Sequence, residues 1–342
     1  MTPLHQLTDA NQRLVIALGD PAGIGMEVTI KALADPRCPR DMKPLLVGCR
    51  TSLIRTYQLL HNLKNFPLVD PDDLEIEDLP IPGGPLDPGD AGVTSGEACF
   101  RWLNRAVELV QGGHGRALVT APIAKHIWHA AGHPYPGQTE RLAELDGADA
   151  ASMLFTAVSP RTGWRLNTLL ATTHIPLQQV SQALTPALVS SKLETLARFC
   201  KRFNPSPELL VAGLNPHAGE KGQLGTEEEQ WLTPLLHRWA EANPTIRLRG
   251  PLPPDTCWLS AAQAWSRNNS PGPDGILALY HDQGLIPVKL LAFDQAVNTT
   301  LGLSFLRTSP DHGTGFDIAG QGIARCDSML SAIAAAWTLS QA

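Results

Sequence analysis

Three short apolar segments of this chain each run into a histidine, and this repetition constrains the fold more than any other feature. The segments are residues 169–173 before His174, residues 209–214 before Asn215-Pro216-His217, and residues 276–280 before His281. Short aliphatic runs bounded by turn residues are typical of the buried strands of a parallel sheet. In open α/β sheets, ligands bind outside the carboxyl ends of the strands. The pattern therefore predicts an α/β protein with three imidazoles at one sheet edge.

Three imidazoles at one edge can hold a divalent cation, because three protein ligands leave an open position for a substrate. A single histidine after a strand is usually a hydrogen-bonded structural residue, but three in the same topological position favour a shared site. We therefore predict that His174, His217 and His281 are metal ligands. The sequence leaves the metal open among zinc, magnesium and cobalt.

Length and charge narrow the classes of protein. A chain of 342 residues predicts two lobes or one large α/β unit. Its 27 basic and 33 acidic residues give a net charge of −6 without a long basic block, which argues against nucleic-acid or anionic-membrane binding. No apolar stretch approaches the roughly 18–20 residues that span a bilayer. Residues 1–13 lack the apolar core of a secretory signal, and six scattered cysteines contain no CxxC pair, so we expect a cytoplasmic location with reduced thiols.

Strand and helix signals alternate along the chain. We predict strands at 14–18, 44–48 and 117–120, and helices from about residue 26, at 97–111, from Pro186 to about 203, and near 328–339. The segment 66–92, dense in Pro, Asp and Gly, is predicted to form loops and turns. Thr185 before Pro186 is typical of a helix N-cap. The alternation predicts parallel strands joined by crossover helices.

A glycine-rich turn, residues 19–25, joins the first predicted strand to the next helix. Backbone N–H groups in such a turn can approach an anion closely. The segment has neither the GxGxxG spacing of a dinucleotide fold nor a phosphate-loop GKS/T. A tight structural turn and a ligand contact both stay open here.

Seven motifs lie along nearly the whole chain, in order, at residues 19–25, 120–125, 172–177, 213–220, 250–256, 280–284 and 307–314. Taken together, they resemble the motifs of one enzyme family, the NAD-dependent 4-hydroxythreonine-4-phosphate dehydrogenases of pyridoxal 5′-phosphate biosynthesis. The resemblance implies that the three histidines bind the metal where two subunits of a homodimer meet. It also implies that Lys289, Asn298 and Arg307 contact the phosphorylated substrate.

The same resemblance implies the architecture. We expect two α/β/α lobes with a cleft between them, as in isocitrate and isopropylmalate dehydrogenases. The first lobe would comprise approximately residues 1–135 plus 300–342, and the second approximately residues 136–299, with the metal ligands and dimer contacts.

One position departs from the family pattern. The family commonly has Gly-His-Thr-Glu where this chain has Gly137-Gln138-Thr139-Glu140. Gln138 and Thr139 are expected to contact the substrate, but glutamine cannot carry a proton near neutral pH. Substrate choice is therefore open between 4-phosphooxy-threonine and a 4-phosphorylated threonate or erythronate.

A second similarity concerns the coenzyme. Residues 312–324 resemble the nucleotide-binding loop of isopropylmalate and isocitrate dehydrogenases, which lack the Rossmann turn. It implies that His312, Gly313, Thr314 and Asp317 bind NAD or NADP. The alternative is a glycine-rich loop that only leads into the last helix.

The family reaction oxidises the hydroxyl carbon β to a carboxylate, passes hydride to NAD, and is followed by loss of carbon dioxide. A divalent cation suits each of these steps. Lys289, between apolar neighbours, could also transfer a proton, while Asp255 and Asp282 are candidates either for acid–base work or for orienting a metal ligand. The sequence does not rank the two aspartates, and either could instead be a structural turn residue. A metal-dependent hydrolase or transferase on a related scaffold is the alternative from another class.

Overall fold

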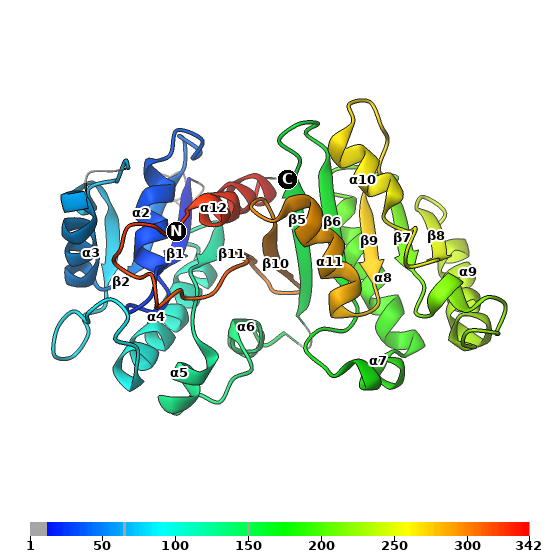
Figure 1. The fold of residues 1–342 in the computed structure, drawn as a ribbon, viewed down its shortest axis with the longest axis horizontal. Coiled ribbons are helices and arrows are strands. Elements are labelled where there is room, and N and C mark those ends of the chain that lie inside the picture. The colour runs from blue at the N-terminus through cyan, green and yellow to red at the C-terminus, as the bar shows by residue number, and fades with distance from the viewer. Residues whose placement is uncertain (1–11, 64–65, 149–150, 342) are drawn as a thin grey trace, which may run out of the picture. The chain divides into compact units, whose positions relative to one another are not determined.

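The computed structural model describes residues 12–63, 66–148 and 151–341, and these form a mixed α/β protein (Figure 1). The predicted fold class is confirmed. The described residues divide into two compact units: the first unit lies within Met1–Ala151 and Val297–Gln341, and the second unit is Ser152–Ala296. The lobe limits predicted from the sequence stay a prediction. No helix among the described residues has the length and apolar character that a membrane span requires.

The first unit contains six strands in the order β3-β2-β1-β4-β11-β10. All neighbouring pairs are parallel except β10 with β11. The strands are β1 (Arg13–Ala17), β2 (Lys43–Gly48), β3 (Glu75–Asp78), β4 (Ala117–Thr120), β10 (Val297–Leu301) and β11 (Leu306–Pro310).

Helices cover this sheet and form much of the core of the first unit. They are α2 (Gly25–Ala34), α3 (Arg50–Leu63), α4 (Val93–Gln111), α5 (Lys125–Ala130), α6 (Gln138–Asp146) and α12 (Asp327–Leu339), with a 3₁₀ turn η1 (Pro71–Asp73). Helix α4 packs on β1, β2 and β4, while α12 packs on β4, β10 and β11. Leu14, Val15 and Ile16 of β1 are fully buried because both faces of a parallel strand are covered.

The second unit contains five strands in the order β5-β6-β9-β7-β8. Strand β5 is antiparallel to β6, and the other pairs are parallel. The strands are β5 (Ser152–Val158), β6 (Arg165–Leu170), β7 (Glu208–Ala212), β8 (Arg247–Leu252) and β9 (Gly275–Ala278).

Helices α8 and α11 contact the central strands β6 and β9 of the second unit. Its helical segments are α7 (Leu177–Ala183), α8 (Pro186–Cys200), α9 (Thr233–Ala242), α10 (Leu259–Ser266), α11 (His281–Ala292), the 3₁₀ turn η2 (Pro216–Gly219) and the π turn η3 (Glu228–Leu232). Thr185 caps α8 as predicted, because its hydroxyl accepts a hydrogen bond of 3.2 Å from the N–H of Leu188.

The sequence pattern missed five of the eleven strands in the described residues, namely β3, β5, β8, β10 and β11. The segment 66–92, predicted to contain only loops and turns, holds the short strand β3 beside β2. Strands β5 and β10 were not predicted either, and each belongs to an antiparallel pair. A hairpin needs no crossover helix, so the expected alternation of strand and helix is absent at these places.

Candidate active site

The three histidines follow three neighbouring parallel strands of the second unit. Strand β9 pairs in parallel with β6 on one side and with β7 on the other. His174 comes shortly after β6, His281 follows β9, and His217 follows β7. The carboxyl ends of these strands therefore bring all three to one sheet edge.

At this edge two of the three imidazoles, those of His174 and His281, lie near one another. The ring centroids of His174 and His281 are 5.5 Å apart, and the rings are tilted by 46°. Within the described residues, no three His, Cys, Asp or Glu side chains gather closely enough to hold a cation. The side chain of His217 is largely exposed. Their role as metal ligands stays a prediction.

The chemistry of the donor set fits a metal centre. Nδ1 of His281 lies 2.7 Å from a carboxylate oxygen of Asp282, and Nδ1 of His217 lies 2.8 Å from one of Glu220. A carboxylate at Nδ1 fixes the ring and leaves Nε2 as the nitrogen that can bind a metal. Asp282 is thus placed to orient His281. Glu220 was missed by the sequence interpretation, although its spacing three residues after His217 could have indicated it.

The loop that carries His217 is strained. Four of its non-glycine residues, His217, Ala218, Glu220 and Lys221, have φ between 43° and 56°, in the left-handed region. Each such residue costs of order 1–3 kcal/mol, and such strain clusters at functional sites. The surrounding contacts must hold this backbone in place.

A cavity of about 380 Å³ opens beside two of the histidines. Ligand pockets for small molecules begin at roughly this size. Polar and apolar residues line it: Thr173, His174, Ile175, Leu177, Val180, Tyr280, His281, Asp282, Gln283 and Ile286.

The other two candidates for proton transfer are exposed. Asp255 lies on the turn after β8, and Lys289 lies on the outer side of α11 beside the exposed Leu290. The apolar neighbours of Lys289 in the sequence therefore do not bury it within the described chain. The catalytic roles of Asp255 and Lys289 stay predictions.

A second cluster lies in the first unit around Arg307, whose side chain is buried with 3% of the residue exposed. Its guanidinium donates to the hydroxyls of Thr120 (3.0 and 2.7 Å) and Thr300 (3.1 Å), and to the amide oxygen of Gln138 (2.8 Å). All of these partners are neutral. Burial lowers the pKa of Arg307 to about 10, and the charge of Glu140 opposes this change, so the group stays protonated at neutral pH.

The residues around this guanidinium suit a phosphate. Gln138 and Thr139 form the first turn of α6, where the helix dipole favours an anion. The amide N–H of Gln138 is held by the carbonyl of Ala121 at 3.1 Å, which fixes its oxygen toward Arg307. The amide oxygen of Asn298 is buried without a hydrogen-bond partner among the described residues, as expected of a group that awaits a ligand.

Two glycine-rich segments singled out from the sequence meet in the first unit. The N–H of Ile24 donates to the carbonyl of Thr314 at 2.8 Å, and a Cβ on Gly23 would come within 2.8 Å of the same oxygen. Only glycine fits at that approach. Nε2 of His312 is buried without a partner in the described part of the chain, so this junction has a free polar atom to offer a nucleotide. Asp317 is exposed on the same loop.

The far end of this loop is anchored by charge. Lys31 on α2 binds Glu27 at 2.6 Å and donates to the carbonyls of Gly322 (2.8 Å) and Ala324 (3.0 Å). Both side chains of the Lys31–Glu27 pair are buried. The pair therefore fixes the backbone of residues 322–324 to α2.

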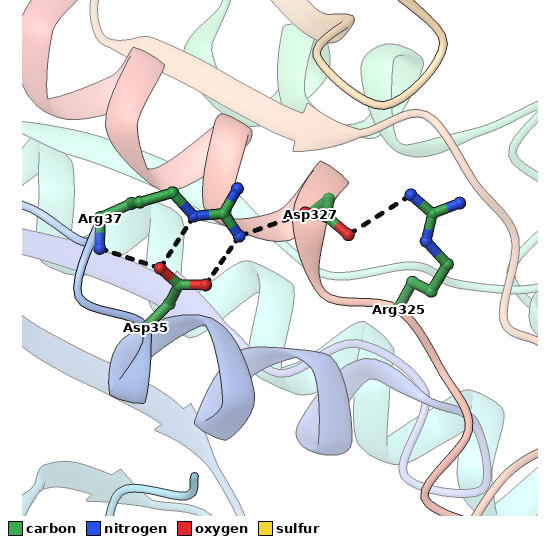
Figure 2. Close-up of polar contacts among 4 residues, drawn as sticks. All are labelled: Asp35, Arg37, Arg325 and Asp327. Carbon is green, nitrogen blue, oxygen red and sulfur yellow. Dashed lines mark hydrogen bonds and ion pairs between the residues drawn. The ribbon is translucent and has the colours of Figure 1, made fainter. Parts of the chain in front are cut away.

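Beyond that point a chain of ion pairs fixes the start of α12. Figure 2 shows Arg37 between Asp35 and Asp327, with Arg325 on the other side of Asp327. The distances from Arg37 are 2.7 Å to Asp35 and 3.2 Å to Asp327. These groups are partly exposed and pair with one another, so they support the loop rather than form a binding site.

Comparison with known proteins gives one consistent match. Residues 40–336 match the family model described as pyridoxal phosphate biosynthetic protein PdxA. A 4-hydroxythreonine-4-phosphate dehydrogenase of Synechococcus sp. (strain RCC307) is 62% identical over 323 residues, which cover 94% of this chain and 97% of that protein. The enzyme of the same name from Synechocystis sp. (strain ATCC 27184 / PCC 6803 / Kazusa) is 51% identical over 94% of this chain and 93% of its own length. The crystal structure of 4-hydroxythreonine-4-phosphate dehydrogenase from Klebsiella pneumoniae superposes with a TM-score of 0.81 at 36% identity, covering 97% of this chain and 99% of that one.

Proposed function

Because the chain belongs to the PdxA family of pyridoxal phosphate biosynthetic proteins, we propose that it catalyses the reaction for which its relatives are named, the dehydrogenation of 4-hydroxythreonine 4-phosphate. It is an oxidoreductase. In the proposed reaction the hydroxyl carbon β to the carboxylate is oxidised and its hydride passes to NAD or NADP. The β-keto acid then loses carbon dioxide to give 3-amino-2-oxopropyl phosphate.

The observation that best supports a metal-assisted reaction is the position of three imidazoles after three adjacent parallel strands. We propose that Nε2 of His174, His217 and His281 would hold a zinc, magnesium or cobalt ion. When bound, that ion would polarise the oxygen on the reacting carbon. Asp282 and Glu220 keep two of the rings in the required orientation through Nδ1.

The substrate phosphate is proposed to bind Arg307 in the first unit. A buried cation with only neutral hydrogen-bond partners is costly until an anion joins it. Gln138 and Thr139 would contact the same group from the first turn of α6, and Asn298 would contact the rest of the substrate. Lys289 and Asp255 stay candidates for proton transfer.

The coenzyme is proposed to bind at the junction of residues 19–25 with residues 312–317. His312, Gly313, Thr314 and Asp317 would supply the contacts. The unpartnered Nε2 of His312 and the close approach at Gly23 support this placement.

We further propose a homodimer with its active sites at the subunit interface. Ile286 and Leu290 on α11 and Phe293 directly after it recur every three or four residues and are strongly exposed, Leu290 to 82%. The same helix carries His281 and Lys289. A second copy covering this face would remove the apolar stripe from water.

A cytoplasmic location also belongs to this proposal. All six cysteines are free thiols, and four of them are buried. Thiols of this kind persist in a reducing compartment.

The dehydrogenase relatives favour oxidation over the hydrolase or transferase alternative. Substrate choice is the remaining alternative, since Gln138 supplies a neutral amide beside Arg307. Purified enzyme should form NADH or NADPH, followed at 340 nm, with 4-hydroxythreonine 4-phosphate and a divalent metal. Faster turnover of 4-phosphothreonate or 4-phosphoerythronate would reassign the substrate, and no reduced coenzyme with any of the three would refute the proposed reaction.

A further inference from the structure

One buried amide connects two of the three histidine-bearing loops of the second unit. Gln283 lies in the first turn of α11, two residues after His281, and its side chain is buried. Helix α11 begins directly against the sheet because residue 284 is glycine: a Cβ there would come within 2.5 Å of Leu170. The amide of Gln283 is thereby placed between the ends of β9 and β7.

Both ends of this amide are used. Its oxygen accepts a hydrogen bond of 2.7 Å from the N–H of Leu279, at the end of β9 and two residues before His281. Its nitrogen donates a hydrogen bond of 2.7 Å to the carbonyl of Gly213, at the end of β7 and four residues before His217. A single side chain thus spans the backbones that lead to two of the histidines.

The His217 loop is held from its other side by a buried carboxylate. Glu228 accepts hydrogen bonds from the N–H groups of Leu214 (2.8 Å) and Asn215 (2.7 Å). The carbonyl of Gly213 and the next two N–H groups are therefore all fixed just before the strained residues 217–221. Such contacts hold an otherwise unfavourable backbone in place.

We propose that Gln283 is a positioning residue that sets the place of His217 relative to His281. The inference rests on the metal centre proposed above. Only a carboxamide serves here, since one end must accept from an N–H and the other must donate to a carbonyl. A carboxylate would face the carbonyl of Gly213 with like polarity, and an apolar side chain would leave two buried backbone groups unpaired.

The test uses Gln283→Glu and a matched control, Asn167→Asp. Asn167 on β6 is also buried, accepts from the hydroxyl of Thr156 (2.8 Å), and donates to the carbonyl of Asp274 (2.8 Å). Asp274 immediately precedes β9, so this bridge lies at the opposite edge of the sheet from the histidines. Both substitutions change a buried amide to a carboxylate that faces a backbone carbonyl. They differ in position, because Gln283 lies at the sheet edge that carries the histidines and Asn167 lies toward the opposite edge.

Cobalt(II) is titrated into the full-length proteins and followed by calorimetry and by its visible absorption. Gln283→Glu should bind cobalt about 10- to 100-fold more weakly than wild type, as loss of a group that orients metal ligands does. Asn167→Asp should stay within about twofold of wild type. Gln283→Met, whose side chain is uncharged and of similar length, should show the same loss of cobalt affinity. If Gln283→Glu does not fold, Gln283→Met is compared with wild type in its place.

Equal cobalt affinity in wild type and in a folded Gln283 variant would overturn the inference alone, and so would an equal loss in Asn167→Asp. A wild-type protein without stoichiometric cobalt binding would overturn the metal centre, and the inference with it.

Discussion

Replacement of Arg307 by methionine separates a substrate-binding role from a structural one. The guanidinium has five N–H groups, and four are engaged by Thr120, Thr300 and Gln138. One N–H on Nη1 is thus left for a phosphate oxygen. A hydrogen bond from a charged donor contributes about 1.5–3 kcal/mol. Arg307→Met should therefore raise KM for the phosphorylated substrate about 10- to 100-fold.

The stability of the free protein should change much less. Burial lowers the pKa of Arg307 well below its ordinary value, to about 10, so carrying the charge in the folded chain costs about 3 kcal/mol. The methionine variant loses this cost, but it leaves the oxygen of Gln138 without its donor, which costs about 1–3 kcal/mol. The two effects nearly cancel, and the free energy of unfolding should move by less than about 2 kcal/mol.

The assay is steady-state NADH formation, together with urea unfolding of the same preparations. Arg165→Met is the control, because Arg165 is half-buried, contacts the hydroxyl of Thr156 at 3.5 Å, and lies at the start of β6. Its KM should stay that of wild type. An unchanged KM in folded Arg307→Met, or an equal rise in both variants, would refute the assignment.

Four further outcomes are expected. His217→Ala should bind cobalt at least tenfold more weakly and lose turnover while its circular dichroism stays native; undiminished cobalt affinity would remove it from the metal site. Burial raises the pKa of Asp20, so the ionised carboxylate destabilises the folded chain at pH values above the ordinary pKa of aspartate. Asp20→Asn should therefore unfold at a higher temperature than wild type, by a difference in Tm that grows between pH 4 and pH 8. A difference in Tm that shrinks over this range would contradict the expected sign. Lys31→Met removes the hydrogen bonds that hold the backbone of residues 322–324. It should therefore raise KM for the coenzyme several-fold in steady-state assays and leave KM for the substrate unchanged. Equal rises in the two KM values would indicate general destabilisation instead. Leu290→Glu should shift the sedimentation coefficient toward that of a monomer, and an unchanged coefficient would exclude α11 from the interface.

The strands that precede the three histidines could be predicted from the sequence because buried strands consist almost entirely of apolar residues. Residues such as Leu209, Leu210 and Val211 form an unbroken apolar run, as strands covered on both faces do. The order β6-β9-β7, however, brings β9 between two strands that precede it in the chain. The spatial order of strands does not follow from local sequence. The pattern therefore predicted that the three histidines share one sheet edge, but it did not predict which of them are neighbours.

The polar groups that hold the site were harder to predict than its candidate ligands. Gln283 and Glu228 each bind backbone atoms, and such partners leave no side-chain pattern in the sequence. Lys289 illustrates the opposite case. Its apolar neighbours suggested burial, but on a helix consecutive residues point in different directions, so Val288 is buried while Lys289 and Leu290 are exposed.

X-ray absorption of the zinc- or cobalt-loaded enzyme examines the three-histidine metal site itself, because it counts the imidazoles around the metal. We predict one tightly bound ion per chain, three imidazole nitrogens at about 2.0–2.1 Å for zinc, and loss of one imidazole in each of the variants His174→Ala, His217→Ala and His281→Ala. A metal with one imidazole or none, or a spectrum unchanged by these substitutions, would contradict it.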